Sequence, residues 1–430
     1  MRVLVLGGGG REHAIVKKLV ESPKVSAVLC ARGNGGTAGI AENVIVDIED
    51  PKAVADLANA RTIDLVVIGP EASLVAGVAD EVAARVIRVF GPKRAAARIE
   101  GSKEFAKSVM QRHGIPTGGF AAFNDIDAAL GYVREVGAPI VVKADGLAAG
   151  KGVTVAMHLH AAEEAIHECL EGRFGEAGVT VLIEEFLEGP ECSLLAFTDG
   201  TTVRPMLPCQ DHKRAFDDDA GPNTGGMGAY TPVPAVSRHT LAEMEHLLDD
   251  TVAGLRDEGI DFRGVLYGGF VLTDEGPKVL EYNARFGDPE TQVIMPMLET
   301  DLLDILIAVA DGTLADVELS WRDGACVTVV MAAGGYPGSY VNGKVITGID
   351  DAEGIEGVTV YHAGTAIDDD GDLVTAGGRV LDVTAVAPTF AEARERAYAA
   401  VDRIGFEGMH FRRDIGTRAL PGPTKDWTRS

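Results

Sequence analysis

Cysteine is scarce in this chain, with 5 residues among 430. No pair has the short spacing of a metal-binding motif, and an odd number does not suit a complete set of disulfides. Disulfide-stapled secreted domains and cysteine zinc sites are therefore excluded, and the thiols fit a reducing compartment. We interpret all five as packing residues: Cys30, Cys169, Cys192, Cys209 and Cys326.

Long hydrophobic runs are also missing. No apolar stretch approaches the roughly 18 residues that suggest a membrane-spanning helix. The apolar start, Met1–Leu6, gives way to glycine and then to charge after a few residues. That is too short for the hydrophobic region of a signal peptide. We expect no membrane partner and a cytoplasmic location.

Positive charge is in short supply, because 39 lysines and arginines face 65 aspartates and glutamates, for a net charge of −26. Such a surface repels nucleic acid and anionic membranes, so neither is expected as a partner. An anionic substrate must instead be held by a local group of basic side chains. The sequence carries no signal for the oligomeric state, for which a monomer or a weak dimer is our expectation.

Glycine, in contrast, is abundant, with 53 residues in a chain that is 46% hydrophobic. This composition describes a folded globular protein, and the length allows two to four domains. We predict a multidomain fold of mixed α/β and α+β class. The expected parts are an N-terminal α/β domain over residues 1–102, a central unit over 103–325 and a strand-rich C-terminal domain over 326–430.

The first part alternates short apolar strands with helical stretches, which favours a parallel sheet covered on both faces. Its expected elements are a helix over Arg11–Ser22 and strands over Val3–Leu6, Val25–Cys30, Leu65–Ile68 and Val86–Phe90. Beyond it, Ser102 should cap a helix that runs to His113. Further expected elements are a strand over Val181–Leu187 and a helix over Phe390–Ile404.

The glycine run Gly7–Gly10 after the first strand only loosely resembles a dinucleotide-binding turn. Counting Gly-x-Gly-x-x-Gly from Gly7 puts Glu12 at the last glycine, and counting from Gly8 puts His13 there. The second strand also lacks the acidic residue that would hold a ribose. An NAD-dependent dehydrogenase is therefore disfavoured. A phosphate at the helix N-terminus and a plain tight turn both remain open.

The most informative segment is Lys143-Ala144-Asp145-Gly146-Leu147-Ala148-Ala149-Gly150-Lys151-Gly152. Its two lysines lie on either side of a loop with almost no bulk, between an apolar strand and a second strand over Val153–Val155. Glycine lets backbone N–H groups approach phosphate oxygens closely, and the lysines supply positive charge. The segment therefore suits the polyphosphate of a nucleotide.

A Walker-type phosphate loop does not explain this segment. That motif needs four residues between its glycines, whereas Gly146 and Gly150 enclose three, and Gly152 stands where Ser or Thr is required. β-Branched residues then follow in place of a helix. Two readings remain, a nucleotide lid built from sheet and an ordinary β-hairpin with solvated lysines.

A second chemical signal lies in the segment Val279–Glu290. On a strand, Glu281 and Asn283 project from the same face. A carboxylate and an amide oxygen so placed suit Mg²⁺ or Mn²⁺, which fills its remaining positions with phosphate oxygens and water. Arg285, just beyond, can hold a carboxylate through two hydrogen bonds. The alternative is a strand-end turn without a metal.

A third signal is the stretch 208–235, which we expect to be a long loop without regular structure. It contains Asp211–Arg214 and the glycine-rich Gly221–Gly228, and long loops inside compact domains are usually functional. We give His212 no catalytic role. No Ser, Cys or His triad can be assembled from the sequence motifs.

Together these residues describe ATP held by two lysines, a divalent ion at an acid–amide pair and an arginine for a carboxylate. A carboxylate facing the γ-phosphate can be phosphorylated to a mixed anhydride, which an amine then attacks. Such catalysis depends on positioning and charge neutralisation and needs no covalent enzyme intermediate.

The chain resembles the ATP-grasp superfamily and, within it, the phosphoribosylamine–glycine ligases. The likeness runs in one order along nearly the whole sequence. The segments that carry it are Gly9–Ala14, Gly33–Thr37, Gly69–Ala72, Lys143–Gly152, Gln210–Arg214 with Gly221–Tyr230, Glu281–Gln292 and Met331–Gly338.

This resemblance implies that ATP, glycine and 5-phosphoribosylamine give glycinamide ribonucleotide, ADP and phosphate. It also implies a Rossmann-like N-terminal domain, a central ATP-grasp domain whose mobile lid covers about 120–190, and a C-terminal domain. Carried over by position, the ATP residues are Lys103, Lys143, Gly150 and Lys151 for phosphate, Glu184, Glu185 and Leu187 for adenine, and Glu191 for ribose.

The same likeness assigns Glu281 and Asn283 to the metal. Glycine and the acyl phosphate would lie at Arg285 and Asp288, with Gly225 and Gly226. Lys151, Arg285 and Asp288 are the implied catalytic residues. The phosphoribosyl group would be held with the help of Gly9, Gly10 and Gly335.

Several positions depart from the family pattern. Gly8 replaces Asn, while Arg32 and Ser73 each replace Pro, all in the N-terminal domain. No acidic residue stands between Val265 and Leu272, the strand that supplies a metal ligand in many ATP-grasp enzymes. Other readings are another ATP-grasp carboxylate–amine ligase and a nucleotide-binding regulator without turnover.

Overall fold

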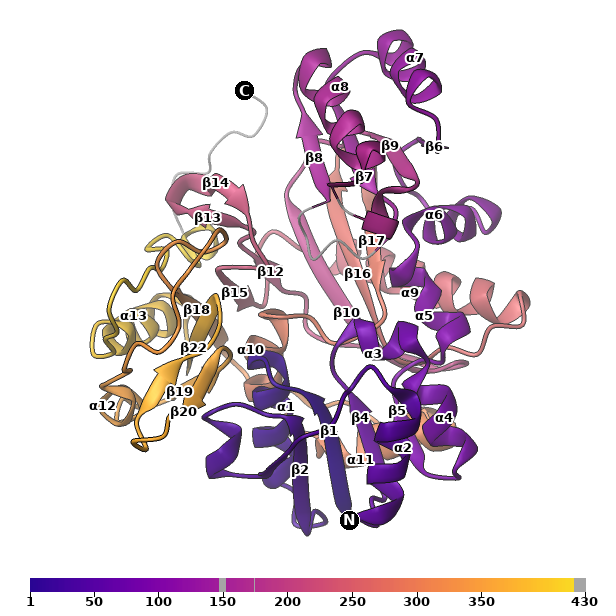
Figure 1. Ribbon diagram of the computed structural model, residues 1–430. Helices are drawn as coiled ribbons and strands as arrows, with labels where there is room; N and C mark the ends of the chain where they lie inside the picture. Colours follow the sequence, from indigo (N-terminus) through magenta and orange to yellow (C-terminus); the bar gives the residue numbers. More distant parts are fainter. Residues whose placement is uncertain (147–151, 174, 421–430) are drawn as a thin grey trace.

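The structure, a computed structural model, describes residues 1–146, 152–173 and 175–420. Figure 1 shows an N-terminal domain at the bottom, a small sheet with helices at the top, a central sheet between them and the C-terminal sheet at one side. The predicted multidomain α/β and α+β class is confirmed.

The N-terminal domain is a parallel sheet in the order β3 (Glu42–Val44), β2 (Ala27–Arg32), β1 (Arg2–Gly7), β4 (Leu65–Ile68) and β5 (Arg88–Phe90). Residues 3–7 of β1 are buried without alternation, as expected for a strand covered on both faces. The helices are α1 (Gly10–Val20), α2 (Pro51–Ala60), α3 (Glu71–Ala76), α4 (Val78–Ala84) and α5 (Arg94–Gly101).

Several expected boundaries shift by one or two residues in this domain. Helix α1 starts at Gly10 because Gly9 caps it, with the Glu12 side chain accepting from the Gly9 N–H at 2.7 Å. Strand β2 begins at Ala27, and β5 begins at Arg88 because Val86 has a φ of 61° and forms a turn. The short strand β3 was not expected from the sequence.

The small upper sheet is antiparallel, in the order β6 (Phe120–Phe123), β9 (Val181–Glu185), β7 (Ile140–Ala144) and β8 (Val153–Ala156). Its helices are α7 (Ile126–Val136) and α8 (Leu159–Glu168), followed by short turns Cys169–Arg173 and Gly175–Gly178. This lid sheet, as we call it, has a separate hydrophobic core that includes Leu130, Val142 and Ile183. Strand β9 ends two residues before the predicted Leu187.

The central sheet is also antiparallel, in the order β11 (Val203–Pro205), β10 (Glu191–Asp199), β16 (Arg263–Thr273) and β17 (Gly276–Asn283). The associated helices are α6 (Lys103–Arg112), α9 (Arg238–Asp257), α10 (Glu290–Ile294) and α11 (Leu302–Asp311), with short turns Met295–Met297 and Leu314–Asp316. Ser102 caps α6 as predicted, because its hydroxyl accepts from the Phe105 N–H at 3.1 Å.

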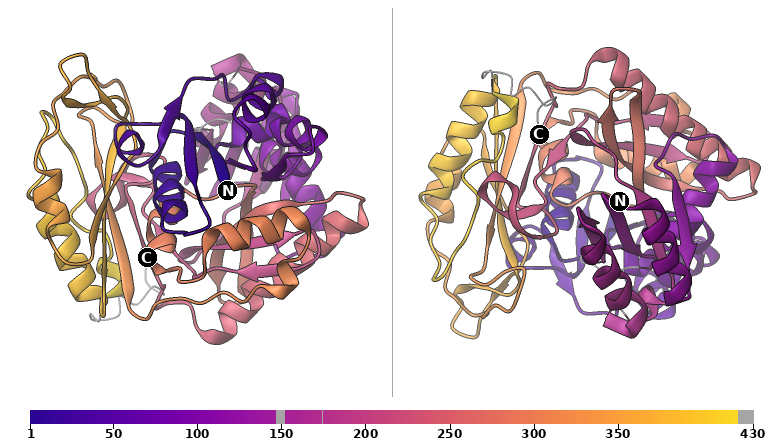
Figure 2. Two further views of the ribbon diagram at one scale, coloured as in Figure 1. Left: turned by 90° about the horizontal axis from the view of Figure 1, so that it is seen from below. Right: turned by 90° about the horizontal axis from the view of Figure 1, so that it is seen from above.

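The C-terminal sheet has the order β12 (Gln210–Asp211), β15 (Gly228–Thr231), β18 (Ala325–Ala332), β22 (Arg379–Ala387) and β19 (Val358–His362). This part of the chain also contains a separate hairpin of β20 (Thr365–Ile367) and β21 (Leu373–Thr375), helix α12 (Ile349–Glu353), helix α13 (Phe390–Val401) and a turn at Thr417–Ala419. The N-terminal domain has a similar turn at Thr37–Gly39, between β2 and β3. In the two views of Figure 2 the C-terminal sheet stands at one side, with α13 on its outer face.

The prediction of a structureless loop over 208–235 is wrong. Strands β12 and β15 join the C-terminal sheet, and β13 (Arg214–Phe216) pairs with β14 (Ala220–Asn223) around the turn Asp217–Asp219. Gly225 and Gly226 lie in the turn between β14 and β15, whereas the apolar pair Ala229 and Tyr230 is buried against β18. Helix α13 ends at Val401, three residues before its predicted end.

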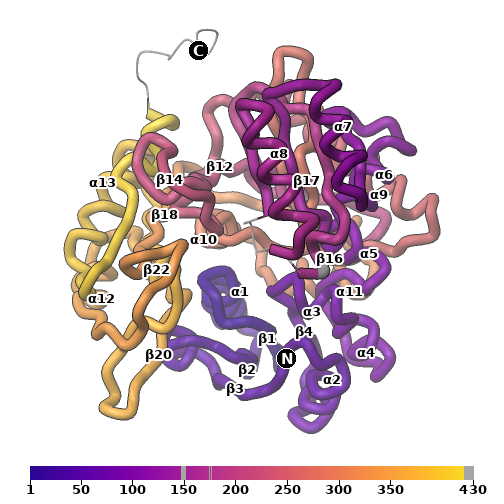
Figure 3. The backbone as a smooth tube through the Cα atoms, turned by 45° about the horizontal axis from the view of Figure 1, so that its top comes forward, coloured from indigo at the N-terminus to yellow at the C-terminus, as the bar shows by residue number. Residues whose placement is uncertain are grey.

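Helix α10 lies where the parts of the molecule meet, in contact with α1, β15, β18 and β22 (Figure 3). Across the described residues, no helix is long and apolar enough to cross a membrane. All five cysteines are described, and each is free and buried, as predicted.

Candidate active site

Lys143 on β7 reaches from the lid sheet to the central sheet. Its Nζ lies 3.0 Å from Glu184 Oε2 on β9 and 3.4 Å from the carbonyl oxygen of Leu280 on β17. Leu280 precedes Glu281, so a predicted phosphate ligand stands beside the predicted metal pair. This contact joins two segments that are 137 residues apart.

Glu184 is shared by two lysines. Lys107 Nζ on α6 lies 2.8 Å from the same Oε2 atom, and the carboxylate is 4% exposed. Burial alone would raise the pKa of Glu184, but the ammonium groups of Lys143 and Lys107 outweigh burial and lower it. Its Oε1 atom is buried without a hydrogen-bond partner in the described part of the chain.

Lys107 was missed in the sequence. It follows Lys103 by four residues, a spacing that places both side chains on one face of α6 and could have revealed it. Lys103 Nζ donates to the carbonyl oxygens of Gly146 at 3.0 Å and Asp145 at 3.3 Å. Burial lowers the pKa of the Lys103 ammonium. The other predicted phosphate ligands, Gly150 and Lys151, lie outside the described residues.

The predicted metal pair is on β17, where Glu281 lies opposite Gly269 and Asn283 opposite Tyr267. Burial would raise the pKa of Glu281, but Lys213, Lys143 and Lys103 outweigh it and lower the pKa. Both side chains are partly exposed, and neither makes a side-chain hydrogen bond to any described residue. No cluster of three or more His, Cys, Asp or Glu able to hold a metal occurs within the described ranges.

The predicted adenine and ribose residues lie where the lid sheet connects to the central sheet. Glu185 ends β9, and its Oε2 accepts from the Gly119 N–H at 3.0 Å. Leu187 lies in the connection to β10, and Glu191 begins that strand. Glu191 Oε2 is 2.8 Å from Lys213 Nζ.

Lys213 is a second lysine that sequence reasoning missed. It follows β12 and forms that ion pair with the predicted ribose ligand, while its charge also lowers the pKa of Glu281. Burial would lower the pKa of Lys213, but Glu191, Asp211 and Glu281 raise it. Lys213 could have been identified from the sequence, because it lies in the Asp211–Arg214 motif, between the segments predicted to bind nucleotide and metal.

Arg285 is held by two carboxylates from the N-terminal part of the chain. Its Nε lies 3.2 Å from Glu71 Oε2, and one Nη lies 3.0 Å from Glu100 Oε1. Burial would lower the pKa of Arg285, but these carboxylates raise it. A third N–H donates to the Phe286 carbonyl at 3.3 Å, so two of five guanidinium donors are not used by these contacts. Neither carboxylate was predicted as its partner.

Asp288 lies beside the predicted glycine-binding turn. Its Oδ1 accepts from Gln292 Nε2 at 2.8 Å and lies 3.3 Å from Arg379 Nη1, which also donates to the Gly225 carbonyl at 2.8 Å. Burial would raise the pKa of Asp288, but Arg379 and Arg11 lower it. Gly226 has a φ of 115°, and a Cβ there would lie 2.5 Å from Pro289 Cδ.

The three glycines predicted for the phosphoribosyl group lie around this same cluster. A Cβ on Gly9 would lie 3.3 Å from Asp288 Oδ2, and one on Gly10 would lie 2.6 Å from Gln292 Nε2. Gly335 forms a turn after β18, and the hydroxyl of the next residue, Tyr336, accepts from the Gly225 N–H at 3.1 Å.

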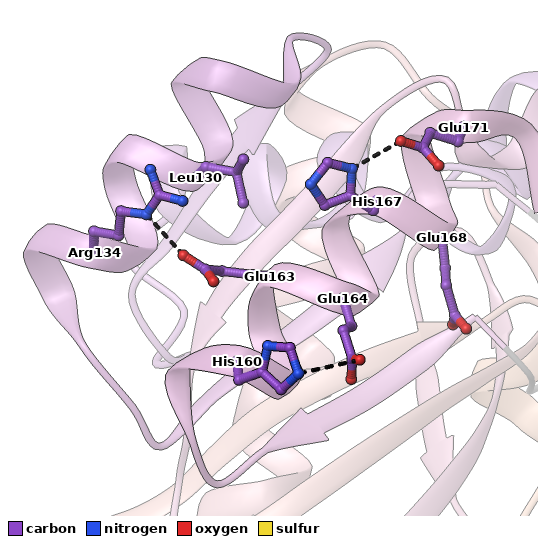
Figure 4. Close-up of a pocket in the computed structure, with 8 residues that line it drawn as sticks. All are labelled: Leu130, Arg134, His160, Glu163, Glu164, His167, Glu168 and Glu171. Atoms are coloured by element: carbon purple, nitrogen blue, oxygen red, sulfur yellow. Dashed lines mark hydrogen bonds and ion pairs between the residues drawn. The ribbon is translucent and has the colours of Figure 1, made fainter.

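A separate hollow lies between α7 and α8 of the lid sheet (Figure 4). Its walls carry the ion pair Arg134–Glu163 and two contacts between a histidine ring and a carboxylate, His160–Glu164 and His167–Glu171. None of the predicted site residues lines it. We therefore do not assign the nucleotide to this hollow.

Family models match three successive parts of the chain. They are described as the N domain of phosphoribosylglycinamide synthetase over residues 1–100, its ATP-grasp (A) domain over 101–291 and its C domain over 326–418.

Relatives match over the full length. Phosphoribosylamine–glycine ligase from Mesorhizobium japonicum is 52% identical and that from Brucella melitensis 51%, each over 421 residues and 98% of this chain. The alignments cover 99% and 98% of those relatives.

Solved structures of similar fold include a member of the same family. The crystal structure of phosphoribosylamine–glycine ligase from Thermotoga maritima matches 96% of this chain and 100% of its own, with a TM-score of 0.85 and 36% identity. Biotin carboxylase from Campylobacter jejuni covers 98% of this chain and 95% of its own, with a TM-score of 0.75 at 16% identity, which shows the fold alone. The chain belongs to the phosphoribosylamine–glycine ligase family of ATP-grasp enzymes.

Proposed function

We propose that this protein joins glycine to 5-phosphoribosylamine at the expense of ATP, giving glycinamide ribonucleotide, ADP and phosphate. The observation that carries the proposal is the reach of Lys143 from the lid sheet to Leu280, beside Glu281. This contact puts an ammonium group beside a pair of oxygen donors, and that arrangement supports an ATP-dependent ligase.

The triphosphate would lie among the ammonium groups of Lys103, Lys143 and Lys151, next to Gly150. Adenine would bind at the lid-to-centre connection formed by Glu184, Glu185 and Leu187, with ribose at Glu191. The position of these residues at one junction supports the assignment. Because the site collects several cations in a protein of net charge −26, it can bind a polyanion that the rest of the surface repels.

Glu281 and Asn283 would hold Mg²⁺ or Mn²⁺. The residues fit such an ion, because they offer hard oxygen donors from one strand face and make no side-chain hydrogen bond to another described residue. When bound, the ion supplies positive charge that stabilises the transferring phosphoryl group. With a single carboxylate, the site should bind the ion mainly together with the nucleotide.

Glycine would lie near Arg285, Asp288 and the turn at Gly225 and Gly226. Its carboxylate oxygen attacks the γ-phosphorus, the bond to ADP breaks and glycyl phosphate forms. Since Glu71 and Glu100 already hold Arg285, the guanidinium is fixed in orientation, and its remaining N–H donors can address the glycine carboxylate. Lys151 would neutralise charge during the transfer.

The amine of phosphoribosylamine, held with the help of Gly9, Gly10 and Gly335, then attacks the carbonyl carbon and releases phosphate.

We further propose a mobile lid over about 120–190 and domain limits at 1–102, 103–325 and 326–430. A monomer or weak dimer in the cytoplasm, without nucleic acid as a partner, completes the proposal. Free buried thiols and the strongly acidic surface support these last points.

A coupled assay for ADP, run with and without glycine and phosphoribosylamine, tests the function. We expect turnover only when glycine and an amine nucleophile are both present, and glycinamide ribonucleotide as the product when that amine is phosphoribosylamine. Preference for another amino acid would favour a different ATP-grasp ligase. ATP binding without ADP formation would indicate a regulator in place of an enzyme.

A further inference from the structure

An aspartate lies in the middle of an otherwise apolar strand of the C-terminal sheet. Asp382, in the sequence Val380-Leu381-Asp382-Val383, is 1% exposed on β22, opposite Val330 of β18 and Tyr361 of β19. Burying a carboxylate is costly unless partners compensate for its lost hydration. Its presence among core residues therefore needs an explanation.

Asp382 faces the cluster of predicted substrate residues. Gln292 Nε2 on α10 donates to Asp382 Oδ2 at 3.2 Å and to Asp288 Oδ1 at 2.8 Å, so one amide group bridges two carboxylates. The first turn of α1 closes the cluster, because a Cβ on Gly10 would clash with Asp382 Oδ2. Figure 3 shows α1 and α10 beside β22.

Two acceptor atoms in this cluster are left without partners. Asp382 Oδ1 and Gln292 Oε1 are both buried, and neither has a hydrogen-bond partner among residues 1–146, 152–173 and 175–420. Flipping the Gln292 amide is no remedy, since it would turn its oxygen toward two carboxylates. Arg379, the neighbouring cation, is engaged by Asp288 and Gly225. What the site lacks is a hydrogen-bond donor.

The charges around Asp382 suit it to proton transfer. Burial and the neighbouring carboxylate of Asp288 raise the pKa of Asp382 to about 7, with Arg379 and the Gln292 hydrogen bond acting in the opposite direction. Tyr361 faces it from β19, and the pKa of that phenol is raised well above its usual value, so it stays neutral. A carboxylate that titrates near neutral pH can accept a proton during turnover.

We propose that Asp382 is a further catalytic residue, which binds the acceptor amine and takes up the proton that this amine loses. The inference rests on the proposed ligase function. In the step, the amine nitrogen bonds to the glycyl carbonyl carbon, the bond from that carbon to the phosphate oxygen breaks, and phosphate leaves with the electron pair. One N–H proton passes from the new ammonium to Asp382 Oδ1.

The test compares two nucleophiles in the full-length enzyme with ATP and glycine. Asp382→Asn should slow ligation of phosphoribosylamine by about 10²-fold or more, the usual range for a lost general base. Glycine-dependent hydroxamate formation with hydroxylamine should stay near the wild-type rate, because this weakly basic nucleophile needs less help in losing its proton. The acidic limb of the pH profile for phosphoribosylamine should disappear in the variant.

A matched control replaces Thr328 and Thr384 together by valine. Their hydroxyls form a buried hydrogen bond of 2.7 Å between β18 and β22, two residues along from Asp382. This change should leave both reactions intact. Asp382→Glu, which keeps an ionisable group, should retain more ligation than Asp382→Asn and keeps the test valid if the latter does not fold.

The outcomes separate this inference from the proposed function. Absence of glycine hydroxamate in the wild-type enzyme would contradict the ligase chemistry itself. Normal ligation by Asp382→Asn, or equal loss of both reactions, would overturn the role of Asp382 while leaving that chemistry in place.

Discussion

Several buried polar side chains each contact two oppositely charged or hydrogen-bonding partners. Glu184 forms ion pairs with Lys143 and Lys107, and Arg285 forms ion pairs with Glu71 and Glu100. The amide of Gln292 donates hydrogen bonds to both Asp288 and Asp382. Removing one member of a buried pair is more damaging than never having the pair, because the partner is left desolvated. Single substitutions at shared groups should therefore have large effects.

Glu184→Gln should lower the free energy of unfolding by about 3–5 kcal/mol at neutral pH, since two lysines lose their counter-ion. The folded-state pKa of Glu184 lies below its ordinary value of 4.5, so its contribution is complete above that pH. The contribution is lost as pH falls through the lowered pKa. Urea unfolding of both proteins from pH 7 downward should show the deficit shrinking below about pH 4.5.

Glu185→Gln is the matched control, because Glu185 is exposed and accepts only from the Gly119 N–H in the described structure. We expect its unfolding free energy to change by less than about 1 kcal/mol. A similar decrease in the free energy of unfolding for both variants would mean that the ion pairs of Glu184 with Lys143 and Lys107 contribute no more stability than an exposed carboxylate.

Glu281→Gln should raise the Mg²⁺ concentration needed for half-maximal turnover sharply, because the site would keep only neutral oxygen donors. Titration of ADP formation against Mg²⁺ and Mn²⁺ at saturating ATP measures this effect. Since Glu281 also faces Lys213, ATP binding without metal serves as the internal control. An unchanged metal requirement would remove Glu281 from the metal site.

At the scale of elements, turns hold the ends of strands against one another. The turn between β14 and β15 lies on Pro289, and its Gly225 carbonyl accepts from Arg379 of β22. Gly226 permits this packing through its positive φ and its lack of a Cβ. The precision of the Asp288 cluster therefore depends on backbone that carries no functional side chain.

Gly226→Ala should destabilise the protein by about 1–3 kcal/mol, the usual cost of a strained backbone conformation. It should also reduce turnover by displacing Gly225 from Arg379. Gly131→Ala is the opposite case, because Gly131 lies inside α7 with open space around it. That control should stabilise by about 0.5–1 kcal/mol. Thermal unfolding of both variants checks the difference in sign.

Local pattern was sufficient for the strands that carry most of the residues predicted to bind nucleotide and metal. The two strands around Lys143–Gly152 and the strand with Glu281 and Asn283 follow from apolar runs and alternation. The pairing of 208–235 did not, because its strands are only two to four residues long. Strands β12 and β15 find their partners in the C-terminal sheet, and β13 and β14 pair with each other. Such short segments have too little pattern of their own.

Partners that are distant in the chain were likewise beyond sequence reasoning. Glu71 and Arg285 are 214 residues apart, and Gln292 and Asp382 are 90 apart. Their local sequences give no sign of the contact. By contrast, Lys107 could have been found from its spacing to Lys103.

At the scale of the whole molecule, the net charge of −26 sets the response to salt. Most acidic residues lie on the surface, where their repulsion destabilises the compact state and is screened by ions. The melting temperature should rise as NaCl increases from low to about 1 M. Sucrose at matched osmolality controls for general solvent effects, and a melting temperature that ignores salt would exclude this account.

The hydrogen bond from Lys143 to the Leu280 carbonyl connects the lid sheet to the central sheet, and the Lys107–Glu184 ion pair is a second connection beside it. Any movement of the lid sheet away from the central sheet must break both contacts and hydrate the freed charges. If Lys143 binds the triphosphate as we propose, the nucleotide would offer this ammonium group a replacement for the Leu280 carbonyl. Nucleotide binding would then lower the cost of opening at Lys143, while the Lys107–Glu184 pair would still have to break.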